Sequence, residues 1–302
     1  MKQEYAHIGL AKICGWFGVT RQAHYQYTTR VEELTIESDL ILKQVRRIRL
    51  EHPMIGVRKL YVMLENFLFE HQIKIGRDGL FNLLTSHNLL IKRRVSFKKT
   101  TNSNHWLKKY PNLIQNIEVI KPNQIWVSDI TYWKISVGFV YISLITDVYS
   151  HMIVGHSVLA TMEAKGPVQA LQKAIKKSEK NRTNLIHHSD RGAQYCSAGY
   201  VTILEANNIR ISMTQSGDPR ENAIAERVNG ILKNEYLCKE QVTDLIQARK
   251  ILNKSIDKYN KQRPHMSISN LTPEYVYKKT NGLRTKKLWK TSNRYNLDNP
   301  PF

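Results

Sequence analysis

The chain has 302 residues, 41% hydrophobic and 24% charged, which is enough for about two globular domains with a sizeable core. Lysine and arginine outnumber aspartate and glutamate by 46 to 25, and the resulting charge of +21 favours a polyanionic partner, nucleic acid ahead of an anionic membrane. Three widely spaced cysteines, no apolar leader and no membrane-length apolar run argue against a disulfide framework, a zinc knuckle or a membrane protein, and indicate a cytoplasmic location.

Residues 1–32 predict a helix-turn-helix element. The stretch 10–27 is typical of a helix, a turn at Gly18-Val19 and a second helix that Thr20 caps. This spacing would place the second helix in a groove of DNA, although an ordinary helical hairpin has the same pattern. The side chains offered to DNA are then Arg21, Gln22 and His24.

A second helical DNA-binding unit is expected over residues 33–100. It begins with a long amphipathic segment up to His52, and Pro53 ends that segment. Two shorter helices are expected at 56–68 and 76–90. A basic run closes the unit, and its role is either that of a solvated linker or that of a phosphate contact. We expect phosphate contacts from Lys92, Arg93 and Arg94.

Residues 101–120 predict a linker, and residues 121–280 predict an α/β domain, followed by a basic tail at 281–302. Three β-rich stretches come first in the domain, and helices and strands then alternate. That order is typical of an RNase H-like mixed sheet, although several α/β folds share parts of it. Strands are expected at 125–135, 139–150, 152–160, 185–190 and 209–214, and helices at 164–180, 197–208, 221–236 and 244–260.

Three carboxylates stand at points of this domain that the fold would bring together. Asp129 interrupts the apolar first strand, Asp190 ends the strand in IHHSDRGAQY, and Glu226 lies on the helix 221–236. Three like charges repel, so such a cluster points to a divalent cation, and oxygen ligands favour Mg²⁺ or Mn²⁺ over zinc. Two ions in one site can support phosphoryl transfer. Lys233 falls on the same helical stripe as Glu226 and would reach a DNA phosphate.

The order Asp129, Asp190, Glu226, with 35 residues between the last two and Lys233 seven after the glutamate, resembles the DDE signature of retroviral integrases. WVSDITYW, HHSDRGAQY, ENAIAERVNGILKNE and YNKQRPHMSISNLTPEYVY resemble the OrfB-type transposases of insertion-sequence family three, along nearly the whole chain. The resemblance implies an integrase-like catalytic core with these three carboxylates as metal ligands and Lys233 as a DNA contact.

The resemblance also implies a substrate and partners. Terminal inverted repeats of the element would be bound as double-stranded DNA, and a nick at the element end would expose a 3′-hydroxyl that attacks a second phosphodiester. A homo-oligomer on the bacterial nucleoid and an upstream-frame partner or fusion are expected. Two other functions stay open from the residues alone: a regulator whose catalytic fold is vestigial, and a nuclease that cuts without joining.

Several residues near the motifs admit two interpretations. Glu221 rivals Glu226 as the third carboxylate, but only Glu226 fits the helical register with Lys233. Asp147 is expected to bind a backbone or arginine partner rather than metal, and Arg263 is either a phosphate contact or half of a buried pair. Further DNA contacts are expected from Arg191, Gln194 and Tyr195.

Overall fold

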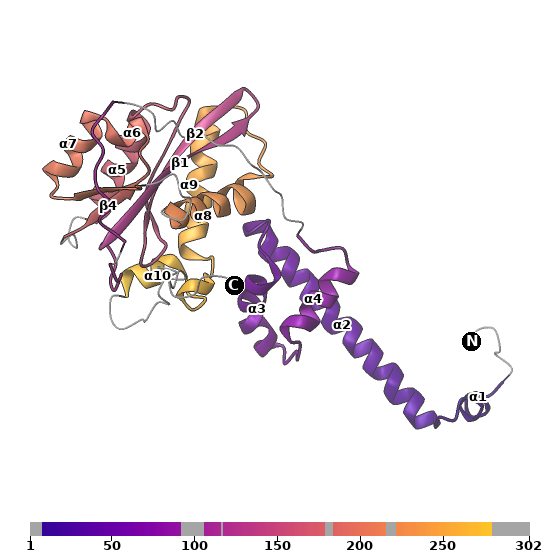
Figure 1. The fold of residues 1–302 in the computed structure, drawn as a ribbon. Coiled ribbons are helices and arrows are strands. Elements are labelled where there is room, and N and C mark those ends of the chain that lie inside the picture. Colours follow the sequence, from indigo (N-terminus) through magenta and orange to yellow (C-terminus); the bar gives the residue numbers. More distant parts are fainter. Residues whose placement is uncertain (1–7, 92–105, 116, 179–183, 216–221, 280–302) are drawn as a thin grey trace, which may run out of the picture.

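The computed structural model describes residues 8–91, 106–115, 117–178, 184–215 and 222–279. It has an elongated helical part, drawn from indigo to violet in Figure 1, and a core in which helices cover a sheet. Among the described residues, no helix is both long and apolar enough to span a membrane.

The helical part begins with the two helices that the sequence predicts. Thr20 caps the second one, because its Oγ1 accepts a hydrogen bond from the amide of Ala23 at 3.1 Å. That helix then continues without interruption through position 32, where the boundary between two units was expected. No proline or glycine lies between Gly18 and Pro53 to break it. The helices are α1 (Leu10–Trp16), α2 (Arg21–Glu51), α3 (Val57–Glu70) and α4 (Arg77–Ser86).

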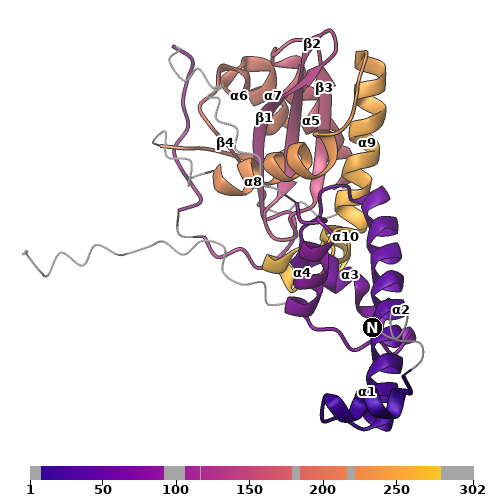
Figure 2. The same ribbon diagram turned by 90° about the vertical axis from the view of Figure 1, so that its right-hand side faces the viewer.

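The second half of α2 forms a small core with α3 and α4. Ile41 and Val45 of α2 are buried there against Leu60, Leu64 and Leu84 of the shorter helices. The first half of α2 extends away from this core and carries α1 at its far end (Figure 2). The helical part therefore holds the predicted recognition helix at one end of a long rod.

The core contains a five-stranded mixed sheet in the order β3-β2-β1-β4-β5. β1 pairs antiparallel with β2, and β2 with β3, whereas β1 and β4, and β4 and β5, are parallel. All five strands fall where the sequence predicts them, with ends that differ by a few residues. Their bounds are β1 (Ile125–Ile135), β2 (Gly138–Asp147), β3 (Ile153–Leu159), β4 (Ile186–Ser189) and β5 (Arg210–Met213).

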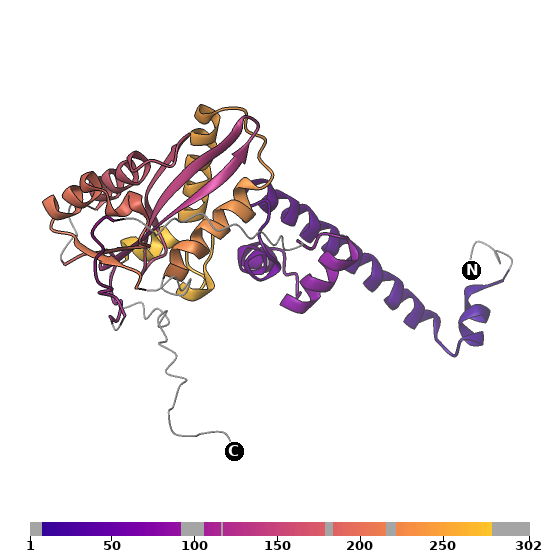
Figure 3. The same cartoon turned by 45° about the horizontal axis from the view of Figure 1, so that its top comes forward.

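Helices cover both faces of the sheet (Figure 3). One face packs on α5 and α7, where Gly155 of β3 is so close to α5 that a Cβ would clash with the carbonyl oxygen of Ala170. The other face packs on α8 and α9 through Trp133, Val228 and Leu252. The bounds are α5 (Lys165–Lys177), α6 (Ala193–Cys196), α7 (Ala198–Ala206), α8 (Ala223–Ile231), α9 (Leu245–Lys261) and α10 (Pro273–Lys278).

The helix expected over 221–236 is only in part an α-helix. It is α-helical from Ala223 to Ile231 and then continues as a π-helix, η2 (Leu232–Leu237). A π-helix closes i→i+5 hydrogen bonds and is frequent at functional sites. The α-helical register that was extended from Glu226 to Lys233 was therefore wrong beyond Ile231, because the wider turn changes the direction of every later side chain.

Buried histidines make the stability of the core depend on pH. Burial lowers the pKa of His151, whose ring is 5% exposed, to about 4. As pH falls, His151 is protonated in the unfolded chain, where its pKa is about 6.5, before it is protonated in the folded chain. The free energy of unfolding therefore decreases as pH falls from about 6.5 towards the folded pKa. At pH 5 the loss from one such residue is about 2 kcal/mol. His151 has a φ of 60°, which asparagine tolerates, so His151→Asn should remove about that much of the pH 7 to pH 5 change. Urea unfolding at both pH values measures it, and an unchanged pH slope would contradict it.

Candidate active site

Two of the predicted carboxylates lie at the same edge of the sheet. Asp129 lies in β1, opposite Leu144 of β2. Asp190 directly follows β4, which runs parallel to β1 with Val127 beside His188. β1 and β4 are parallel and in register, so Asp129 and Asp190, each two residues beyond the Val127–His188 pair, come close although 60 residues separate them in the sequence.

The third carboxylate joins them from α8, which crosses β1 and β2. Burial raises the pKa of Asp129 to about 7, and the charge of Asp190 and, more weakly, that of Glu226 add to the effect. Burial and the charge of Asp190 likewise raise the pKa of Glu226. The three side chains thus interact electrostatically, as the sequence predicts, and each charge makes the others costlier.

Asparagines of the α8 segment fasten it to the carboxylate strand. Asn229 donates from Nδ2 to Oδ2 of Asp129 at 2.7 Å, and the amide of Ile130 donates to Oδ1 of Asp129 at 2.8 Å. Asn222 donates to the backbone carbonyl of Ser128 at 2.9 Å. Both donors to Asp129 lower its pKa and so oppose the burial.

The donor chemistry of this site fits a hard divalent cation. The oxygens of Asp129, Asp190 and Glu226 are ligands that Mg²⁺ accepts. The amide oxygens of Asn222 and Asn229 are buried and have no hydrogen-bond partner among the described residues, so they are open to a donor such as water. No three acidic, histidine or cysteine side chains in the described part of the chain are gathered as a ready ligand set.

Lys233 reaches the same region from η2. Its ammonium lies 4.0 Å from the ring centre of Tyr132 in β1, a cation–π contact. Partial burial lowers the pKa of Lys233, and the charge of Asp129 opposes that change. The lysine that is predicted to contact DNA therefore interacts electrostatically with Asp129, and its ammonium lies over an aromatic ring.

The two histidines of IHHSDRGAQY are buried in the core. Nε2 of His187 lies 2.6 Å from Oγ of Ser128 and 2.8 Å from the hydroxyl of Tyr200. Nδ1 of His188 lies 2.8 Å from Oγ of Ser212. Burial lowers the pKa of His187 to about 3, so this ring is neutral at physiological pH. The histidines therefore tie β4 to β1, β5 and α7.

Tyr195 was wrongly expected to contact DNA. Its side chain is 2% exposed in the apolar cluster beside Tyr200, and burial raises the pKa of its phenol well above the usual value, with smaller contributions from Tyr200, Asp129 and Asp190. The prediction assumed that a tyrosine in a polar loop motif is exposed to solvent, whereas the short helix α6 turns the ring into the core. Gln194 donates to the carbonyl of Met162 at 3.0 Å.

Other candidates are placed as follows. Asp147 is fully buried and accepts hydrogen bonds from the amides of Asn123 at 2.7 Å and Ser150 at 2.8 Å, so its backbone role is confirmed. Arg191 is half-buried beside Asp190. Glu221, the basic residues Lys92, Arg93 and Arg94, and the tail 281–302 lie outside the described residues.

Arg263 forms a buried pair, one of its two expected roles. Its side chain is 2% exposed, and Nε and Nη2 each donate to a carboxylate oxygen of Glu235 at 2.7 Å. Nη1 donates to Nε2 of His265 at 2.9 Å, and burial together with this cation lowers the pKa of His265. The pair holds η2 to the segment that follows α9.

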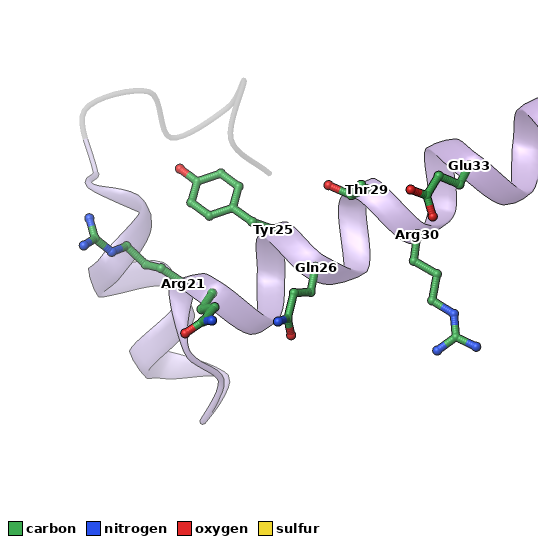
Figure 4. A pocket seen from close by; sticks show the side chains of 7 residues that line it. Arg21, Tyr25, Gln26, Thr29, Arg30 and Glu33 are labelled. Atoms are coloured by element: carbon green, nitrogen blue, oxygen red, sulfur yellow. The ribbon is translucent and has the colours of Figure 1, made fainter.

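The predicted recognition residues Arg21, Gln22 and His24 are exposed at the start of α2. Figure 4 shows the polar and aromatic side chains of the first turns of this helix that line an open pocket on its surface. A positively charged groove of this kind suits a phosphate backbone. The groove is lined by Arg21, Gln22, Tyr25, Gln26, Thr29, Arg30 and Glu33.

Comparison with known families gives two adjoining matches. The family described as Integrase core domain matches residues 120–219, and a second Integrase core domain family matches residues 207–273. Together they cover the sheet, α8 and α9. With the strand order β3-β2-β1-β4-β5, they confirm the RNase H-like integrase core and the helical region in front of it that the sequence predicts.

Relatives match across most of the chain. The Insertion element IS600 uncharacterized 31 kDa protein of Shigella sonnei is 36% identical over 266 residues, 86% of this chain and 96% of that protein. The transposase InsF for insertion sequence IS3A of Escherichia coli strain K12 is 33% identical over 193 residues, 63% of this chain and 67% of that protein. The HTLV-2 integrase catalytic core domain in complex with magnesium is 21% identical, covers 53% of this chain and 99% of its own, and has a TM-score of 0.43.

Proposed function

The chain belongs to the DDE transposases of the IS3 family of insertion sequences, and from that membership we propose that it binds the terminal inverted repeats of its element and cuts and joins their strands with Mg²⁺. The observation that carries the proposal is the electrostatic coupling of Asp129, Asp190 and Glu226 beside the buried amide of Asn229.

The three carboxylates would hold the ions, and the other residues would hold the DNA. Asp129 and Asp190 come from a rigid sheet edge, so they form the fixed part of the site. Glu226 comes from α8 and is drawn towards them when the repulsion between the carboxylates is neutralised. Lys233, whose ammonium lies over the ring of Tyr132, would pair with a phosphate.

Divalent ions held by these carboxylates would lower the pKa of the attacking hydroxyl and neutralise charge on the leaving oxygen. The carboxylates would take no part as nucleophiles, since water and then a 3′-hydroxyl attack in line at phosphorus. Each transesterification forms one phosphorus–oxygen bond and breaks another, and therefore needs no external energy source.

DNA recognition would fall to the N-terminal helices. Arg21, Gln22 and His24 stand at the exposed start of α2, where a recognition helix places its first residues against base edges. Lys92, Arg93, Arg94 and Arg191 would add phosphate contacts. Assembly into a homo-oligomer on DNA, with a partner or fusion from an upstream frame, completes the proposal.

The test uses duplex DNA from both flanks of the element with the full chain, in Mg²⁺ or in EDTA. The 3′ ends and the joined products are mapped at nucleotide resolution. Mg²⁺-dependent cutting and joining supports the transposase, cutting without joining would point to a nuclease, and binding without cutting would point to a regulator.

Asn229 should matter to activity through Asp129. Asn229→Ala removes the 2.7 Å hydrogen bond to Oδ2 of Asp129 and frees that carboxylate to rotate. Partners that orient a metal-ligating group are typically worth about 10–100-fold, so we expect a cleavage rate lower by that factor. A shift of the half-saturating Mg²⁺ concentration to higher values should accompany it. Asn234→Ala, five residues further along the same helical segment and exposed, is the matched control, and an equal loss in both variants would contradict the role of Asn229.

A further inference from the structure

The helical part and the core meet where the end of α2 and the start of α3 lie against η2 and α9 (Figures 1 and 2). His52, the residue that follows α2 as its C-cap, is 2% exposed, and its Nδ1 lies 2.9 Å from the hydroxyl of Tyr236 in η2. Tyr236 is 3% exposed, and the two rings meet edge to face with centres 5.8 Å apart. A hydrogen bond between two buried groups holds a defined geometry, because water cannot replace either partner.

A second contact joins α3 to the same turn of η2. The ammonium of Lys59 lies 3.9 Å from Oε1 of Glu235, and both side chains are largely buried, with exposed fractions of 19% and 17%. Arg263 holds the same carboxylate from the core side. Glu235 is therefore shared between a cation of the helical part and a cation of the core.

A third contact lies at the rim, and apolar contact adds little. Nζ of Lys258 in α9 is 2.7 Å from Oε2 of Glu51, the last residue of α2. Within the described residues, no apolar cluster contains side chains of both parts: the helical cluster ends at Leu90, and those of the core begin at Leu107. Polar contacts have distance and angle requirements that apolar contacts lack, so they fix one relative position of the two parts.

We propose that this junction is a spacer that fixes the distance from the recognition helix to the active site and so selects the phosphodiester that is cut. The junction consists of Glu51, His52 and Lys59 on one side and Lys258, Tyr236 and Glu235 on the other. The inference rests on the proposed function and adds to it the means by which the cutting position is chosen.

One rigid path connects the two ends of this spacer. α2 carries the recognition residues in its first turn and the junction at its last residue, and a helix of 31 residues is about 46 Å long. On the core side of the junction, η2 directly follows α8, the helix that carries Glu226. Successive nucleotides of one strand lie about 3.4 Å apart along B-DNA, so a loose junction would let the active site reach neighbouring phosphodiesters.

The experiment compares cutting positions in the full chain. Lys59→Met with Tyr236→Phe removes the ammonium and the hydroxyl of the two buried contacts but keeps the shape of the side chains. Lys74→Met, at an exposed lysine of the helical part, is the matched control. Wild type and control should cut an element end at one phosphodiester, and the double variant should spread its cuts to the neighbouring ones. A folded double variant that still cuts at the single wild-type position would overturn the inference.

A second measurement needs no activity. Spin labels at exposed positions of α2 and α9, introduced as Tyr27→Cys and Ile246→Cys with Cys238→Ser, report the distance between the two parts. A narrow distance distribution in the otherwise wild-type chain and a broad one with the two junction substitutions support the spacer, and equal distributions overturn it. A wild-type chain that shows the narrow distribution but cuts no DNA would instead count against the proposed function.

Discussion

Replacing Glu226 by glutamine should lower Mg²⁺-dependent cutting and joining by about 10³-fold or more. Glutamine keeps the size of the side chain but removes the negative charge that a cation needs from its ligand. The interactions of an ion with the transferring phosphate are worth several kcal/mol, and each 1.36 kcal/mol corresponds to about tenfold in rate. Binding of the element ends should persist, because the residues proposed to recognise DNA are on α2.

Glu221→Gln is the decisive control for this prediction. Glu221 is the rival third carboxylate in the sequence, five residues before Glu226. We expect its variant to cut and join at close to the wild-type rate. The measurement is single-turnover cleavage and joining of labelled element ends, with Mg²⁺ titrated in each variant. If Glu221→Gln abolished the reaction and Glu226→Gln spared it, the third ligand would be Glu221.

Removing the carboxylate of Glu235 should lower the free energy of unfolding by about 3 kcal/mol. Arg263 is 2% exposed and has its two donors to Glu235 at 2.7 Å, so Glu235→Ala leaves a buried cation without its counterion. Breaking a buried pair from one side costs about 3–5 kcal/mol, and the partial exposure of Glu235 places this case at the lower end. Chemical denaturation of the variant and the wild type gives the difference.

Asp257→Ala is the comparison for Glu235→Ala. It breaks the pair of Asp257 with Lys261, whose side chains are 66% and 53% exposed, and should cost less than about 1 kcal/mol. The double variant Glu235→Ala with Arg263→Met should recover much of the lost stability, because the buried guanidinium is removed together with its counterion. If Glu235→Ala and Asp257→Ala lowered the free energy of unfolding by equally small amounts, the guanidinium of Arg263 would have to reach water when Glu235 is removed.

Much of the fold could be predicted because local pattern and global arrangement agree in the core. β1 and β2 are rich in β-branched and aromatic residues, which favour strands, and both faces of the sheet are covered. The strand before Asp190 is short and buried, although most of its residues are polar. The proximity of Asp129 and Asp190 follows from the parallel register of β1 and β4. The boundary expected between residues 32 and 33 does not interrupt the helix, because no proline or glycine lies within α2.

Long-range polar contacts could not be predicted. Nothing local distinguishes Arg263 in a loop motif from a phosphate-binding arginine, because its partner Glu235 is 28 residues away. The contact of His52 with Tyr236 spans 184 residues. The π-helix could not be predicted either, because LKNEYL has ordinary helix propensity and only its contacts with neighbouring elements widen the turn.

The π-helical turn has a consequence for the comparison and engineering of such enzymes. One helical segment must present Glu226 to the sheet edge and, nine residues later, Glu235 to Arg263. A π-helical turn holds about one residue more than an α-helical turn, so a relative whose segment stays α-helical would present its glutamate in the same direction with one residue fewer. A chimera that grafts a catalytic helix from one transposase onto another must therefore carry the π-helical turn together with its extra residue. An alignment of a π-helical with an α-helical segment needs a one-residue gap at this turn, or the residues that follow it are paired wrongly.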